Sequence, residues 1–417
     1  MKMKQLGVKS SNQYLVYLIS AFFIIGCTPL LTNVYLYIAL WIFFLPYMMF
    51  HLPAWINRHH ALVGALLFFI IQILLYRIIG LSSASWGRYP SHLLSLVPLF
   101  LLLQIHQGVS DKHKKRLFWL VVILMLFNIG DSIRLSILYP FLNIDSVRFY
   151  KDFVATINLG GANFFNCTLV FSCGCFVVFL NAKRIFYRFV MLSCVLLSGF
   201  YLIFFTSKAS IVVYFILSIL LITYAKFAKK QINFFIVLFL SLFIIFYIVE
   251  VYEEDIIRMI IELSPSSRLS SRLIALIDSD SEHASTSSIF ARENYWMLSI
   301  RTWLSNASNF LFGIGDHYTT DNPEKTGIGQ HSDFLDTLAR YGLIGSAFLF
   351  VTLKNSFKYI LSLFDKKIHL QIITILFIYL MCGFTKKVFI IEMSIMMFVF
   401  LPLISYIIDK DNKLNRN

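Results

Sequence analysis

Residues 232–250 read INFFIVLFLSLFIIFYIVE, an apolar run in which the first charged residue is Glu250. A helix of about 20 apolar residues crosses the hydrocarbon core of a bilayer. Comparable runs recur along the chain, so the pattern predicts an all-α polytopic membrane protein. We place about twelve transmembrane helices, near residues 14–31, 33–50, 61–79, 93–108, 117–133, 164–182, 189–206, 209–225, 232–250, 342–361, 370–385 and 388–408.

Composition points to the same class of protein. Of the 417 residues, 58% are hydrophobic and only 14% are charged. These values exclude a soluble domain of this length. Met1 to Lys9 leads directly into the first apolar run without a small-residue cleavage site, so no cleaved signal peptide is expected.

The positions of Lys and Arg predict the orientation in the membrane, because short cytoplasmic loops accumulate positive charge. With both termini on the cytoplasmic side, more than half of the 36 basic residues fall in cytoplasmic segments. The net charge of +14 is then mainly a topology signal, and nucleic acid is not an expected partner. This topology divides the chain into three parts. Residues 1–250 hold nine transmembrane helices with an outer loop near 134–163, residues 251–341 form a large outer loop with short helices, and residues 342–417 hold three helices and a cytoplasmic tail.

Within the large loop, residues 289–305 predict an amphipathic helix that lies against the bilayer. Phe290, Met297 and Leu304 repeat at intervals of seven and form an apolar stripe. Arg301 borders this stripe, where its guanidinium would be held at the membrane surface within reach of a lipid phosphate. The alternative is an ordinary Arg whose side chain extends to the interface without binding a ligand.

His331 stands immediately before a predicted helix start. Ser332 and Asp333 suit the N-cap and first turn of a helix that continues into the tenth transmembrane segment. The amide groups and dipole at such an end favour an anion, and a neutral imidazole can accept a proton or bind phosphate. A purely structural His is the alternative. Gly342 and Gly345 form a small face on which another helix can approach closely.

Three other patterns receive no chemical role. Asp278-Ser279-Asp280 is similar to the metal-binding carboxylate pair of sugar-nucleotide transferases, but it lies in a stretch rich in Ser and acidic residues and is interpreted as a solvated loop. Gly313-Ile314-Gly315 predicts a tight turn. All six cysteines fall within predicted transmembrane helices, where they act as small apolar residues, and no metal site is expected.

The loop resembles a known family in its residue order. His331-Ser332, nine residues and then Gly342-Leu343-Ile344-Gly345 is similar to the His-(Asn/Ser/Gln)-x9-Gly-x-x-Gly signature of bacterial O-antigen polymerases and O-antigen ligases. Arg301 followed by residues 312–315 resembles the upstream part of the same loop. Thr206-Ser207-Lys208-Ala209-Ser210 resembles a further element of the family, Thr-x-Ser-Arg-x-Ser, with Lys208 in the place of Arg. Lys keeps the charge of Arg but cannot bind a phosphate through two parallel hydrogen bonds.

The resemblance implies a GT-C-like membrane glycosyltransferase of the bacterial inner membrane, acting at the periplasmic face without a cofactor or metal. Its donor glycan would be carried on undecaprenyl pyrophosphate, and cations would neutralise the charge as the sugar–phosphate bond breaks. The candidate pyrophosphate-binding residues are Arg272, Arg292, Arg301, Arg340 and Lys208. The acceptor hydroxyl needs a base, for which His331 is the first choice and the reserves are Asp333 and Asp336.

The favoured function is polymerisation of lipid-linked repeat units into O-antigen or a similar polysaccharide. Ligation of the same donor to lipid A core is the nearest rival, because ligases share the His331 signature. A lipid-glycan flippase or transporter is a third possibility, but it would concentrate ionisable groups at mid-membrane rather than in an outer loop. Expected partners are the lipid-linked glycan donor and acceptor, membrane lipid, and a chain-length regulator and a flippase.

Overall fold

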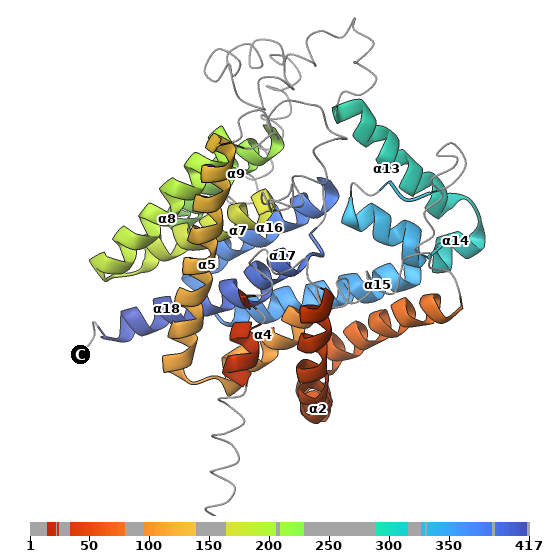
Figure 1. The fold of residues 1–417 in the computed structure, drawn as a ribbon, viewed down its shortest axis with the longest axis horizontal. Helices are drawn as coiled ribbons and strands as arrows, with labels where there is room; N and C mark the ends of the chain where they lie inside the picture. The colour runs from red at the N-terminus through yellow and green to blue at the C-terminus, as the bar shows by residue number, and fades with distance from the viewer. Residues whose placement is uncertain are drawn as a thin grey trace, which may run out of the picture. The chain divides into compact units, whose positions relative to one another are not determined.

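The structure is a computed structural model of the chain. It describes residues 15–21, 23–24, 34–79, 96–138, 164–205, 209–228, 288–315, 327–329, 332–385 and 388–414. Every regular element in these ranges is helical (Figure 1), which confirms the all-α prediction. In chain order they are α2 (Val34–Ile78), α4 (Val97–Gly108), α5 (Asp111–Leu138), α7 (Phe164–Asn181), α8 (Ile185–Phe204), α9 (Ala209–Phe227), α13 (Ser288–Leu304), α14 (Ala307–Phe312), α15 (Asp333–Ser362), η4 (Lys366–Ile368), α16 (His369–Thr385), α17 (Ile391–Ile395), η5 (Met396–Phe400) and α18 (Leu401–Leu414).

Seven of the described helical segments are long and apolar enough to cross a membrane, as judged by length and composition. They are Ile42–Tyr76, Asp111–Arg134, Phe164–Asn181, Ile185–Phe204, Asp333–Ser362, Lys366–Phe384 and Ile391–Asp409. Helix α8 also exposes large apolar side chains, among them Ile185 (84%) and Phe189 (71%), as expected of a surface in contact with lipid. The chain is therefore an α-helical multi-pass membrane protein. The predicted segment 232–250 lies outside the described residues.

Helix α2 differs from its prediction. Two transmembrane helices, near 33–50 and 61–79, were expected with a connection between them, whereas the structure has helix from Val34 to Ile78 with a kink at His59 (φ −136°, ψ 43°). A straight helix of 45 residues would be about 68 Å long, more than twice the thickness of the bilayer core. The kink therefore separates two membrane-length segments, and the helical hydrogen bonding of the first continues as far as the kink.

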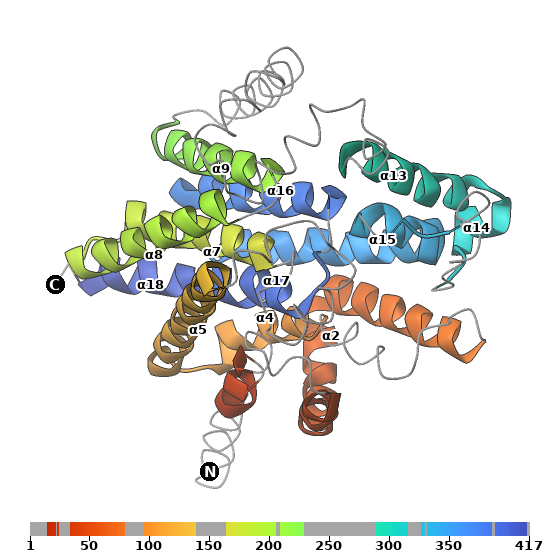
Figure 2. The same ribbon diagram turned by 45° about the horizontal axis from the view of Figure 1, so that its top comes forward.

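The described helices form two compact units. The first unit comprises residues 1–124, 292–363 and 379–407. In it the second half of α2 and helix α15 lie side by side in both views (Figures 1 and 2) and run antiparallel. Phe68 stacks on Phe348 at 5.1 Å between ring centroids, and further along the pair His59 meets Tyr359 at 5.2 Å.

The second unit comprises residues 125–291, 364–378 and 408–417, and helix α7 packs against both α8 and α9 within it. Two polar contacts lie within this unit: the Cys173 thiol donates to Ser218 Oγ at 3.1 Å, and Asn181 Nδ2 donates to Gln371 Oε1 at 2.6 Å. All five cysteines that the structure describes, in both units, are buried free thiols. Their predicted role as small apolar helix residues is confirmed for this part of the chain.

Candidate functional site

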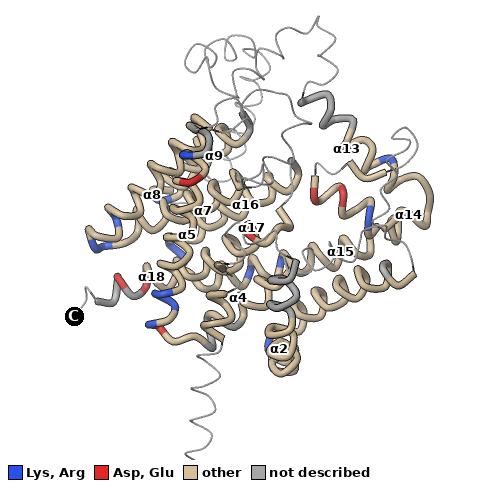
Figure 3. Tube along the Cα trace, in the orientation of Figure 1, with Lys and Arg blue, Asp and Glu red and all other residues tan. Residues whose placement is uncertain are grey.

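Helix α15 begins where the sequence predicts it. Ser332 is the N-cap: its Oγ accepts a hydrogen bond from the backbone N–H of Leu335 and donates to the carbonyl oxygen of Gly383, both at 3.3 Å. Asp333 and Asp336 occupy the first turn, where negative charge stabilises the helix dipole (Figure 3). His331, the preferred catalytic base, lies outside the described residues.

The Asp333 carboxylate is buried and acts as an anchor. Its Oδ2 accepts hydrogen bonds from two consecutive backbone amides, Val388 at 2.5 Å and Phe389 at 2.7 Å. Bonds from N–H groups to an ionised carboxylate are among the strong hydrogen bonds of proteins. Asp333 therefore fixes the segment that precedes α17 against the start of α15.

Asp336 connects α15 to the helix of the large loop. The carboxylate is 1% exposed, and its Oδ1 accepts a hydrogen bond from Ser299 Oγ of α13 at 2.7 Å. Ser299 Oγ in turn accepts from the backbone N–H of Gly329 at 2.9 Å. Thr302, three residues further along α13, donates to the carbonyl of Gly327 and accepts from its N–H, both at 2.7 Å. Residues 327–329 are thus tied to α13 directly before the His331 position.

Helix α13 matches the bounds of the predicted amphipathic helix, and its two faces have different surroundings. The polar side chains of Ser299 and Thr302 are buried against the protein, whereas Met297 is 39% and Leu304 is 56% exposed. Arg301 is exposed between the last two, as the sequence predicts. A helix with an outward apolar stripe bordered by Arg suits the headgroup level of a bilayer.

Helix α15 is interrupted at Gly342, whose backbone has φ +62° and ψ −168°. This conformation is open essentially only to glycine, and it removes partners from the carbonyls that precede it. The carbonyl of Ala339 instead accepts from the N–H of Ile314 at 2.9 Å, and that of Arg340 accepts from the N–H of Gly315 at 2.8 Å. Both of these carbonyl groups are therefore hydrogen-bonded despite the break in the helix.

The same break is held from the other side by α2. Gln72 Nε2 donates to the carbonyl of Tyr341 at 3.0 Å and to the hydroxyl of Tyr76 at 2.9 Å. The Tyr76 hydroxyl donates to the carbonyl of Phe312. A Cβ added to Gly345 would lie 2.3 Å from Gln72 Oε1, so the predicted small face of the signature does receive another helix closely.

Two glycines allow the backbones of the α14–Gly315 segment and α15 to cross in direct contact. Gly313 has φ +77°, and a Cβ there would lie 2.3 Å from the carbonyl carbon and oxygen of Arg340. A Cβ on Gly342 would lie 2.4 Å from the carbonyl carbon and oxygen of Leu311. Real side chains do not tolerate such distances. The tight turn predicted at 313–315 is confirmed, with positive φ at Gly313 and Gly315. It allows this segment to cross the backbone of α15.

The candidate cations are only partly described. Arg340 is 9% exposed on α15 and lies four residues after Asp336, on the same helical face. Arg301 is exposed on α13. Arg292 belongs to α13, but its side chain is not described, and the other two candidates, Arg272 and Lys208, lie outside the described residues. The structure thus places Asp336 and Arg340 on one face of α15, and the Asp336 carboxylate links this helix to the helix of Arg301.

Sequence reasoning missed the residues that assemble the site. Ser299 and Thr302 connect α13 to its neighbours, and Gln72 and Tyr76 reach the break in α15 from α2. One signal was available for Gln72, since an amide inside an apolar transmembrane run needs a polar partner. No local pattern names that partner.

The model of the O-antigen ligase family matches residues 192–350, a range that includes α13, α14 and the interrupted first half of α15. No curated protein matches the chain. The family match confirms the resemblance drawn from the His331 and Gly342 signature, and it supports an assignment to the O-antigen polymerase/ligase family.

Proposed function

From the assignment to the O-antigen polymerase/ligase family, we propose that the chain polymerises oligosaccharide repeat units carried on undecaprenyl pyrophosphate. The growing glycan passes from one lipid pyrophosphate to the sugar of an incoming lipid-linked repeat unit. The product is O-antigen or a similar surface polysaccharide, made at the periplasmic face of the bacterial inner membrane. A chain-length regulator and a flippase are the further partners of this activity.

The proposed architecture has twelve transmembrane helices in a GT-C-like arrangement, with both termini cytoplasmic. Residues 251–341 form the periplasmic loop between transmembrane parts 1–250 and 342–417. The seven membrane-length segments and the apolar helix Ile211–Phe227 support the multi-pass part of this architecture.

The main support for the activity is an overlap. The residues matched by the family, 192–350, include those that make the contacts between α13, α14 and α15. The contact leaves Arg301 exposed beside the apolar side chains Met297 and Leu304. A guanidinium at that level can meet the pyrophosphate of a lipid whose tail lies in the bilayer.

The proposed reaction is a direct displacement. The acceptor hydroxyl attacks the anomeric carbon of the donor sugar, and the bond between that carbon and the phosphate oxygen breaks. Undecaprenyl pyrophosphate leaves with the electron pair, and His331 takes the proton of the hydroxyl. The charge that develops on the leaving group is neutralised by Arg301, with Arg272, Arg292, Arg340 and Lys208 as the further candidate cations.

The contacts of the two carboxylates favour positioning roles over a base role. Asp333 accepts two backbone hydrogen bonds, and Asp336 accepts one from Ser299. A base must reach the acceptor hydroxyl, whereas both groups are buried in contacts that hold the loop. His331 therefore remains the first choice for the proton acceptor.

Ligation is the second candidate function, because the matching family model is that of O-antigen ligases. A ligase would transfer the same donor to lipid A core and would use the same cations and base. The two activities differ in the acceptor. Purified protein supplied with lipid-linked repeat units and no core acceptor should still make chains longer than one repeat. If no such chain forms unless the core acceptor is added, the activity is ligation.

The site is tested by the length ladder of the polysaccharide from cells that lack the protein. Complementation with wild type or with Arg116→Ala, an exposed Arg of α5 outside the loop, should restore the full ladder. With His331→Ala or Arg301→Ala, at verified equal membrane expression, the intensity of every band above one repeat should fall by a factor of about 100 or more. Wild-type ladders from both variants would refute the site, and loss of the single-repeat product as well would indicate ligation or transport.

A further inference from the structure

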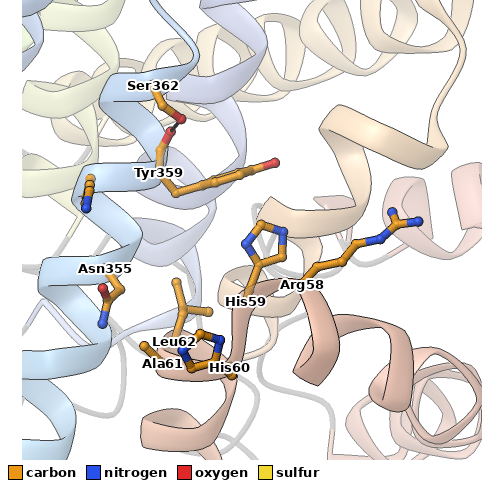
Figure 4. Close-up of a pocket in the computed structure, with 9 residues that line it drawn as sticks. Arg58, His59, His60, Ala61, Leu62, Asn355, Tyr359 and Ser362 are labelled. Carbon is orange, nitrogen blue, oxygen red and sulfur yellow. Dashed lines mark hydrogen bonds between the residues drawn. The ribbon is translucent and has the colours of Figure 1, made fainter.

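The kink of α2 and the last turns of α15 line an open pocket of about 290 Å³ (Figure 4). It is lined by Arg58, His59, His60, Ala61, Leu62, Asn355, Lys358, Tyr359 and Ser362. Four of these side chains carry a basic nitrogen, Asn355 adds an amide, and none of the lining residues is acidic. Such a lining suits an anion with several acceptor oxygens.

Two of the lining side chains are imidazoles, those of His59 and His60. In Figure 4 the rings of His59 and His60 lie toward α15, while Arg58 extends away from it. The His59 ring meets the Tyr359 ring edge-on at 5.2 Å and 80°. His59 Nε2 is enclosed and makes no hydrogen bond to the protein atoms that the structure describes. A buried polar nitrogen in this state favours a ligand that supplies the missing partner.

The pocket lies at the far end of the helix pair from the α13–α14 contact. Because α2 and α15 run antiparallel, Gln72 contacts Tyr341 at one end and His59 contacts Tyr359 at the other. Lys358 lies 16 positions after Gly342, a distance of about 24 Å along a helix, which is close to the thickness of the hydrocarbon core. The pocket therefore lies at the level of the opposite headgroup layer.

Large apolar side chains between the two ends are exposed, as at a surface in contact with lipid. Phe68 of α2 is 58% exposed and Phe350 of α15 is 40% exposed. An occupant of the pocket can thus have its charged group among the basic side chains and its apolar part along the helix pair.

We propose that this pocket binds a phosphate group, carried by the headgroup of an anionic phospholipid in the leaflet opposite the α13–α14 side. Lys358 and Arg58 attract the charge at the mouth of the pocket, and the imidazoles donate hydrogen bonds to phosphate oxygens inside it. The lipid bridges α2 and α15 at the end of the pair that lacks the Gln72 contact. This site is separate from the glycan chemistry proposed above.

Native mass spectrometry of the purified full-length protein tests the site, with phosphatidylglycerol and phosphatidylcholine as probes. Wild type should retain phosphatidylglycerol in preference to zwitterionic phosphatidylcholine. The double variant Arg58→Gln/Lys358→Gln should bind phosphatidylglycerol about tenfold more weakly, since each basic residue near an anionic headgroup contributes to affinity. Lys354→Gln removes an exposed charge one turn earlier on α15, outside the pocket, and should bind like wild type.

The alternatives give distinct results. Equal binding by wild type and the double variant, or equal weakening by Lys354→Gln, would overturn the site. Tight binding of inorganic phosphate that displaces the lipid would overturn the lipid as occupant in favour of a soluble anion. If the double variant does not fold, the charge-retaining pair Arg58→Lys/Lys358→Arg serves instead: retention of phosphatidylglycerol supports the site, and loss of it refutes a site built on charge.

Discussion

A carboxylate whose sequence position suggests a catalytic base can instead hold two segments of the fold together. Asp333 lies beside His331 in the signature, which made it a reserve base, yet its Oδ2 holds the amides of Val388 and Phe389. Two amides on one oxygen leave little freedom for the side chain to turn towards a substrate. At this position the local sequence predicts the start of the helix correctly, but it does not distinguish a catalytic base from a positioning residue.

Asp333→Asn separates the two roles. The amide keeps one oxygen that can accept from Val388 and Phe389 but loses the charge, so the free energy of unfolding should fall by about 1–3 kcal/mol. Activity per folded molecule should be largely retained. The measurements are thermal unfolding in detergent and polymerisation by the purified protein. Abolished activity with unchanged stability would instead identify Asp333 as a base.

At the scale of elements, two short glycine-containing segments cross in direct backbone contact. The turn at Gly313–Gly315 supplies N–H groups to the carbonyls that the break at Gly342 leaves open. Each segment needs glycine, because a Cβ on Gly313 or Gly342 would meet the other backbone within 2.4 Å. The glycines of the family signature thus have a structural reason that is independent of catalysis.

Gly342→Ala should therefore be strongly destabilising. The positive φ alone costs about 1–3 kcal/mol for a residue with a Cβ, and the contact with Leu311 adds to it. Gly64→Ala, a helical glycine of α2 with no heavy atom within 4 Å of the added Cβ, is the matched control and should be neutral or stabilising by up to about 1 kcal/mol. Thermal unfolding of both variants in the same detergent gives the comparison. Similar melting temperatures of the two variants would contradict the close crossing of Gly342 and Leu311.

At the scale of the whole molecule, the distribution of basic residues predicts which segments face each side of the membrane. Because the described cysteines are all buried, a single introduced thiol should react selectively. Asn306→Cys, exposed between α13 and α14, should be labelled by a membrane-impermeant maleimide in spheroplasts. Lys367→Cys, exposed in η4, should be labelled only after the membrane is opened. The reverse pattern would invert the topology.

The features predicted from sequence are those that short-range physics determines. Helices α7, α8 and α15 follow from apolar length, and the cap at Ser332 follows from its side chain. Polar contacts between distant segments did not follow, because nothing near Ser299 in sequence specifies Asp336 as its partner. Helix α2 shows the same limit: the polar residues around His59 indicated a connection, whereas the chain stays helical up to a kink.

The contacts of Gln72 and Tyr76 also determine when the protein can begin to work. Their partners are Tyr341 and Phe312, which follow in the chain 269 and 236 residues later. Helix α2 leaves the ribosome long before α15 does. A partly synthesised chain therefore holds the Gln72 amide and the Tyr76 phenol in lipid before their partners have been made. Contacts over such sequence distances form late in folding. The helix that bears Arg301 is thus held against its neighbours only when synthesis is nearly complete, and a chain truncated before α15 lacks this arrangement.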